Sequence, residues 1–288
     1  MVLGIEITRN ISNGTLKISQ GKYIKKIYEK YCVGRTTRDF CVPVHSAGIV
    51  PFHELEKGTA ADRDAMGKNS LLEILGSLLW VTATRPEISF YISWLCQFMG
   101  SPSMKHYEAA VAVLLYLMHD ADLGITYSAK FPDLSVWTDA SWGRLDKDFG
   151  GHVAMLGGAC ISASSNRNKI KAQSLPELEL YAYCQGCKTL VFHQMLLEFL
   201  FIKLKLPTPI YTDSSGVISY VQKPGATSLN KHFAKFLGLA RDQQLNLVSV
   251  AVHKAGNDQI ADILTKTTTK VVFLKLRALI LGGRDSSA

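Results

Sequence analysis

The chain has 288 residues, which is long enough for one large domain or two ordinary ones. Hydrophobic residues make up 47% of it and charged residues 19%, so it has material for apolar cores and too little charge for a disordered chain. Lysine and arginine number 32 against 24 acids, a formal charge of +8, and this balance favours a polyanionic partner, with nucleic acid the first candidate.

The sequence contains no segment typical of a membrane span or a secretory signal. Its longest clearly apolar run, residues 109–118, is far short of the roughly 20 residues that span a bilayer. The opening MVLGIEITRN carries an acid and has no extended apolar stretch before a small-residue cleavage site. We therefore expect an intracellular protein whose six cysteines are free thiols.

The first half of the chain predicts a β-hairpin followed by helices. The segment IEITRNISNGTLKIS alternates apolar and polar residues around Asn13-Gly14, a pair suited to a two-residue type I′ turn. Apolar residues then recur every three or four positions over residues 20–31, which predicts a helix with a basic opposite face. A long connection is expected over residues 34–69. Further helices are predicted over residues 70–84, 87–99 and 104–119, with Arg85-Pro86 and Ser101-Pro102 between them.

After about residue 121 the pattern changes to short strands and then to alternating helices and strands. The strand-like runs GITYS, LSVWTD, GHVAML and ACISAS come first, followed by a helix over residues 176–203. The strand PIYTD, helices from Ser214 and Asn230, the strand LNLVSVAVH and a last helix complete the chain. This order predicts an α/β domain with a mixed sheet, and we place a domain boundary near residue 130.

Four acids of the second half occur at strand ends or helix starts: Asp139, Glu177, Asp213 and Asp262. Like charges gathered at one sheet edge need cations to neutralise them, and hard oxygen ligands suit Mg²⁺. Each acid also has an ordinary explanation. Asp139 fits an Asx turn and Glu177 a capping box. Asp213 fits a helix cap, and Asp262 fits an ion pair with Lys266 one turn later. Taken singly, the ordinary explanations are the more common, and only the four acids together favour a metal site.

The residues from Ser135 to Lys266 resemble the ribonuclease H domain of copia-type LTR retrotransposon Pol polyproteins. The shared markers are WTDASWG, SLPELELYAY, IYTDSSG and the closing IADILTK. The first half, with GKYIKKIYEKY and GSLLWVTATRPEISFYISWLCQFM, resembles the end of the palm, the thumb and the connection of that family's reverse transcriptase. The resemblance implies a truncated, mainly helical reverse transcriptase region with a short β-hairpin over residues 1–130. It implies a ribonuclease H-like mixed sheet with flanking helices over residues 131–288.

The resemblance also implies an activity, the hydrolysis of the RNA strand of RNA–DNA hybrids by a metal-dependent endonuclease. The family's metal ligands carry over to Asp139, Glu177, Asp213 and Asp262, which would hold two Mg²⁺ ions, with Mn²⁺ as a substitute. Of the two glutamates in PELEL we choose Glu177, since Glu179, two residues on, is expected to face elsewhere on a helix. His253 matches a mobile-loop histidine that assists proton transfer or product release in many ribonucleases H.

Partners are expected from the basic side chains and from the resemblance. Seven lysines are candidates for contacts to nucleic-acid phosphates: Lys22, Lys25, Lys26, Lys30, Lys169, Lys171 and Lys231. A solvated basic face explains any one of them equally well. Because no adjacent pair of aspartates occurs in the chain, the resemblance implies no polymerase activity by itself. It implies a partnership with the fingers and palm of a reverse transcriptase in another chain, no membrane partner, and a place in a cytoplasmic particle or the nucleus.

Two other functions stay open at the level of the residues. Where the family has Ser-Ser-Thr before the helix glutamate this chain has Ser174-Leu175-Pro176, and Ala163 and Ser214 replace a tryptophan and an asparagine. These departures favour a non-catalytic nucleic-acid-binding relic or interaction module derived from a retrotransposon Pol, whereas the intact acids favour the enzyme. Another nuclease or an integrase of the same superfamily is disfavoured by the closing ADILTK and by the reverse-transcriptase-like leader.

Overall fold

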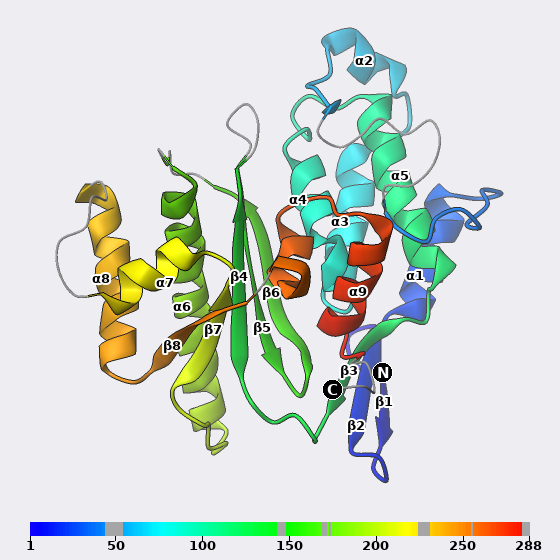
Figure 1. The fold of residues 1–288 in the computed structure, drawn as a ribbon. Helices are drawn as coiled ribbons and strands as arrows, with labels where there is room; N and C mark the ends of the chain where they lie inside the picture. The colour runs from blue at the N-terminus through cyan, green and yellow to red at the C-terminus, as the bar shows by residue number, and fades with distance from the viewer. Residues whose placement is uncertain are drawn as a thin grey trace. The chain divides into compact units, whose positions relative to one another are not determined.

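Two compact units make up the chain in the computed structural model, and each is described by itself (Figure 1). The structure describes residues 1–43, 54–142, 148–168, 172, 174–223, 231–254 and 256–283. The first unit is Met1–Thr126 and the second is Tyr127–Ala288, whereas the sequence pattern places the boundary a few residues later, near residue 130. Within the described ranges, no helix is both long and apolar enough to cross a membrane.

A small sheet with the strand order β1-β2-β3 contains the predicted hairpin. Its strands are β1 (Glu6–Asn10), β2 (Thr15–Ser19) and β3 (Gly124–Ser128). The hairpin of β1 and β2 is confirmed, but the predicted two-residue turn is wrong, because four residues separate Asn10 from its partner Thr15. Asn10 Oδ1 accepts hydrogen bonds from the Ser12 hydroxyl and from the Asn13 backbone N–H. The side chain at the strand end therefore organises a longer loop.

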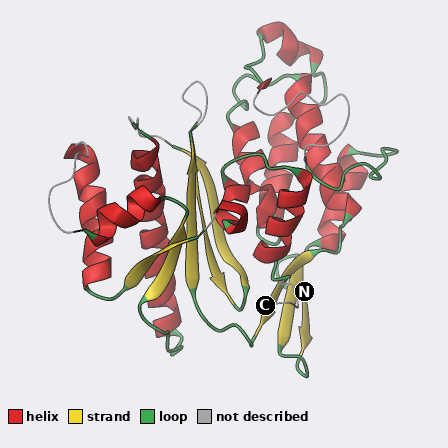
Figure 2. Cartoon of the chain, viewed as in Figure 1, coloured by secondary structure: helices red, strands yellow, loops and turns green. Residues whose placement is uncertain are grey.

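Helices make up most of the rest of the first unit, as the sequence predicts (Figure 2). They are α1 (Gly21–Tyr31), α2 (Ala60–Ala65), α3 (Leu71–Val81), the short 3-10 helix η2 (Pro86–Ile88), α4 (Ser89–Cys96) and α5 (Met104–His119). Helix α2 lies in the stretch predicted as a connection, and it forms because Thr59 and Asp62 make a capping box at its start. A buried ion pair stabilises the interruption between the helices at Pro86, where Arg85 Nε lies 2.6 Å from Glu87 Oε1.

A five-stranded mixed sheet forms the centre of the second unit, with the strand order β6-β5-β4-β7-β8. The strands are β4 (Ser135–Ser141), β5 (Phe149–Leu156), β6 (Ala159–Arg167), β7 (Thr208–Thr212) and β8 (Ser249–His253). Strand β4 is antiparallel to β5, and β5 to β6, whereas β7 runs parallel to β4 and β8 parallel to β7. The carboxyl ends of β4, β7 and β8 therefore lie at one edge of the sheet.

Helices flank this sheet in Figure 1. They are α6 (Leu175–Phe199), α7 (Ser215–Gln222), α8 (Lys231–Leu245) and α9 (Lys270–Ile280), with the 3-10 helices η4 (Gly256–Asp258) and η5 (Ile260–Leu264). The core joins Val136 and Ile210 of the strands to Tyr183 and Leu190 of α6. The predicted fold class, an α/β mixed sheet with flanking helices after a mainly helical region with a short hairpin, is confirmed. The six cysteines are free thiols, as predicted.

The last helix begins later than the sequence predicts. Asp262 lies in η5, and α9 starts only at Lys270. Every residue of η5 is buried, so this segment has no polar face to turn to solvent as an amphipathic helix would. Gln259 fixes its start, because its side chain accepts from the Ala261 N–H and donates to the Thr138 carbonyl at 3.2 Å. A buried 3-10 helix therefore forms where the sequence pattern predicts the first turn of the last α-helix.

Candidate active site

Two neighbouring parallel strands bring Asp139 and Asp213 to the same edge of the sheet. Trp137 of β4 lies opposite Tyr211 of β7, and their rings stack with centroids 4.2 Å apart. Each aspartate follows its aromatic residue by two positions, so the two carboxylates lie level across the strand pair. The cap of α7 is Ser214 and not Asp213, which removes the capping explanation for Asp213.

Helix α6 supplies the third carboxylate, and it comes from Glu179. One ligand atom from each of Asp139, Glu179 and Asp213 lies within 4.8 Å of the other two; we refer to these three residues as the carboxylate cluster. Residues two apart on a helix differ in direction by about 200°, so Glu177 faces away when Glu179 faces the sheet. Glu177 is 4% exposed and is not one of the three grouped acids, so its role as a metal ligand stays a prediction.

Small residues further along α6 indicate that Glu179 faces the sheet, which the E-x-E motif alone does not show. Ala182 and Gly186 follow Glu179 by three and seven positions, the spacing of one helix face. A Cβ on Gly186 would collide with Cγ2 of Thr138, so these small residues mark the face of α6 that lies closest to β4. Glu179 is on this face, two turns before the closest approach, and so reaches Asp139.

Asp262 and Lys266 approach the same carboxylates from the C-terminal segment. Lys266 Nζ lies 3.0 Å from Asp262 Oδ2 and 3.8 Å from Asp139 Oδ2. The Thr265 hydroxyl also donates to Asp139 Oδ2, and the Ser141 hydroxyl donates to the Thr265 carbonyl at 2.8 Å. Asp262 thus forms the predicted ion pair with Lys266 and also lies beside the carboxylate cluster.

Burial makes Glu179, Asp262 and Asp139 difficult to ionise. It raises the pKa of Glu179 to about 9, with the charges of Asp139 and Asp213 adding to the rise. Burial also raises the pKa of Asp262 to about 7, and the charge of Asp139 contributes next. The pKa of Asp139 itself is raised by burial, against the opposing effects of Lys266 and Thr265. A bound cation would relieve this desolvation and repulsion.

The donor set fits a hard divalent cation. Carboxylate oxygens are the ligands that Mg²⁺ and Mn²⁺ prefer, and the 4.8 Å spacing of the carboxylate cluster allows it to close on one ion. Two further oxygens, Glu179 Oε2 and Asp262 Oδ1, are buried with no hydrogen-bond partner within the described part of the chain. Buried acceptors are normally satisfied, and a bound cation would satisfy these two oxygens.

The remaining predicted site residues are a histidine and seven lysines. His253 ends β8, is exposed, and lies opposite Thr212 in the strand register. Three exposed lysines of α1 form ion pairs, namely Lys22 with Glu6, Lys25 with Asp122 and Lys30 with Glu73, and Lys26 is also exposed. Lys169, Lys171 and the side chain of Lys231 lie outside the described residues.

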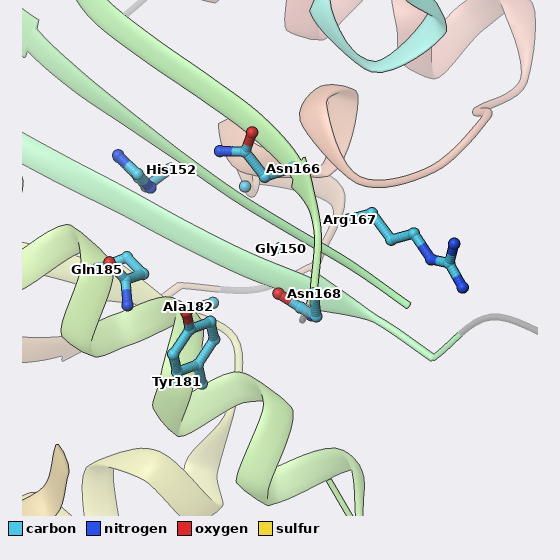
Figure 3. A pocket seen from close by; sticks show the side chains of 9 residues that line it. Gly150, His152, Asn166, Arg167, Asn168, Tyr181, Ala182 and Gln185 are labelled. Carbon is cyan, nitrogen blue, oxygen red and sulfur yellow. The ribbon is translucent and has the colours of Figure 1, made fainter. Parts of the chain in front are cut away.

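A cleft of about 500 Å³ opens beside the carboxylate cluster, between α6 and strands β5 and β6 (Figure 3). It is lined by Ala182, one turn after Glu179, and by Gly151, the register partner of Asp139. The amides of Asn166, Asn168 and Gln185 also line it. Asn168 Nδ2 is a buried donor with no partner among the residues that the structure describes. The cleft can therefore donate hydrogen bonds to an oxygen-rich ligand.

Comparisons with known proteins agree with the motifs. No family model matches the chain. It is 33% identical over 205 residues to the retrovirus-related Pol polyprotein from transposon RE2 of Arabidopsis thaliana, which covers 69% of this chain and 14% of the polyprotein. The corresponding polyprotein from transposon TNT 1-94 of Nicotiana tabacum is 25% identical over 288 residues, or 97% of this chain and 21% of the polyprotein. The chain is a homologue of copia-type retrotransposon Pol polyproteins.

The predicted resemblance is thereby confirmed. This Pol homologue spans between 14% and 21% of the length of these two relatives. A solved structure of LC11-RNase H1 in complex with an RNA/DNA hybrid matches 46% of the Pol homologue and 94% of its own chain, with 19% identity and a TM-score of 0.34.

Proposed function

We propose that the second unit is a metal-dependent ribonuclease that hydrolyses the RNA strand of RNA–DNA hybrids. The observation that carries this proposal is the grouping of Asp139, Glu179 and Asp213 within 4.8 Å at the carboxyl edge of the mixed sheet. The motifs that resemble a ribonuclease H domain support the same role, and so does the similarity to retrovirus-related Pol polyproteins.

The carboxylate cluster would hold Mg²⁺, and Asp262 would complete the set for a second ion. Bound divalent cations would supply an activated water and neutralise the phosphate and the leaving oxygen. Asp139 is the ligand that two ions would share, because it lies both in the cluster and 3.8 Å from the ammonium that pairs with Asp262. Thr265 orients the Asp139 carboxylate by donating to Oδ2.

The cleft would position the hybrid next to the cluster. Proteins recognise A-form duplexes mainly by shape and by contacts to 2′-hydroxyls and phosphates. The amides of Asn166, Asn168 and Gln185, which line the cleft, would supply such contacts without reading the base sequence. The lysines of α1 would add phosphate contacts, and His253, exposed at the end of β8, would assist proton transfer or product release. The remaining reverse transcriptase would be the macromolecular partner of the first unit.

The test uses the full chain, an RNA–DNA hybrid labelled on each strand in turn, and Mg²⁺. Wild type is expected to cut only the RNA strand, and Asp139→Asn should lose about 100-fold or more of that rate, because the substitution removes a shared cation ligand while keeping its shape. Tight hybrid binding by wild type without cleavage would reject the nuclease and favour the non-catalytic relic. Metal-dependent cleavage that survives in Asp139→Asn would reject the assigned site.

A further inference from the structure

Lys266 is a positive charge placed against the acids of the proposed site. Its ammonium lies 3.0 Å from Asp262 Oδ2 and 3.8 Å from Asp139 Oδ2. Those two oxygens belong to the carboxylates that would take the second cation. We propose that Lys266 is a displaceable counter-ion that holds the place of the second divalent cation until that ion arrives. This inference rests on the proposed function.

The two cation positions differ in what already occupies them. A first ion can bind the carboxylate cluster through Glu179 Oε2, which has no partner within the described part of the chain. A second ion has to take oxygens of Asp139 and Asp262, and Lys266 already holds Oδ2 of both. The first site therefore offers an oxygen that nothing in the described part of the chain holds, whereas both oxygens of the second site are already held by a charge of the protein itself.

The side chain of Lys266 is suited to leaving. It is 43% exposed, so its ammonium can be hydrated as soon as it turns away from the two buried carboxylates. The backbone beside it is held in place, because the neighbouring Thr265 is 1% exposed and its hydroxyl donates a hydrogen bond to Asp139. Departure of the lysine head thus leaves the Asp139 carboxylate oriented while a cation replaces the ammonium.

Charge balance explains why a lysine is useful there. Asp139, Glu179, Asp213 and Asp262 bring up to four negative charges into a mostly buried region, and one ammonium compensates at most one of them. Without Lys266 the metal-free site would be less stable and its attraction for a second cation stronger. The expected property of the wild type is therefore one tight and one weak cation site.

The test measures Mn²⁺ binding to the full chain without substrate, by the loss of the free-ion paramagnetic resonance signal and by calorimetry. Lys266→Gln is compared with Lys275→Gln, which removes the same charge from an exposed pair 2.6 Å from Asp258. Lys266→Gln should bind the second ion roughly fivefold to tenfold more tightly than wild type, and Lys275→Gln should match wild type. Lys266→Arg, which keeps the charge, should keep the weak second site.

Each outcome decides the inference. Unchanged affinities in Lys266→Gln, or an Arg variant that binds the second ion as tightly as the Gln variant, would overturn it and leave the nuclease proposal standing. Failure of all the variants and of wild type to bind Mn²⁺ would overturn both. Since Lys266→Gln could fold less well without metal, thermal unfolding supplies a second readout: Mn²⁺ should raise its midpoint by more than it raises that of wild type.

Discussion

Glu179 and Asp262 are both buried carboxylic acids, but the charges around them differ. Glu179 lies 6% exposed beside two other acids, and burial with those charges raises its pKa to about 9. Asp262 is 8% exposed but has Lys266 at 3.0 Å, and its pKa rises only to about 7. A cation must therefore displace a proton more often from Glu179 than from Asp262 near neutral pH.

Glu179 and Glu177 give the sharpest test at the residue scale. Glu179→Gln should lower RNA cleavage by about 100-fold and weaken the tight Mn²⁺ site, because an amide is a poorer ligand than a carboxylate for a hard cation. Glu177→Gln should change cleavage by less than about tenfold, since that side chain lies outside the carboxylate cluster. Both variants are compared by single-turnover cleavage and Mn²⁺ titration. A larger loss in Glu177→Gln than in Glu179→Gln would contradict the geometry.

Sequence alone predicts the aspartates better than the glutamate. Asp139 and Asp213 follow strands whose alternation is plain, and parallel strands in register place such residues side by side. The glutamate depends on the rotation of α6 about its axis, which only packing fixes. The positions of Ala182 and Gly186 would have given that rotation, because small residues on a helix allow close approach to a sheet.

The packing of α6 against β4 keeps Glu179 next to Asp139. Gly186→Ala would press a methyl group against Thr138 on β4, which should cost about 1–3 kcal/mol of unfolding free energy and shift Glu179 relative to Asp139. Gly238→Ala is the matched control, since nothing lies within 4 Å of its added Cβ on α8. It should stabilise the protein by about 0.5–1 kcal/mol. Chemical denaturation and Mn²⁺ titration measure both effects; equal effects of the two substitutions would reject the packing argument.

Element boundaries follow the sequence where local signals dominate. Helix α5 spans Met104–His119, as predicted from its apolar periodicity and the preceding proline. The predictions of a two-residue hairpin turn and of a helix starting at Asp262 were wrong for different physical reasons. Asn10 caps a longer loop with its side chain, and complete burial converts Ile260–Leu264 into a 3-10 helix. Neither the choice of side-chain partner nor burial on all sides is visible in periodicity.

Because the chain forms two compact units, we expect each unit to respond differently to a cation. All the proposed ligands lie in Tyr127–Ala288, so Mg²⁺ should stabilise that unit alone. A ligand at 100 times its dissociation constant adds about 2.7 kcal/mol to the unfolding free energy of the part that binds it. Scanning calorimetry of the full chain should therefore show two transitions, of which Mg²⁺ raises one. Asp139→Asn should abolish that rise without moving the other transition, because it removes a ligand and leaves the first unit intact. A shift of both transitions in wild type would mean that the units unfold together, and a shift that persists in Asp139→Asn would place the cation somewhere other than the carboxylate cluster.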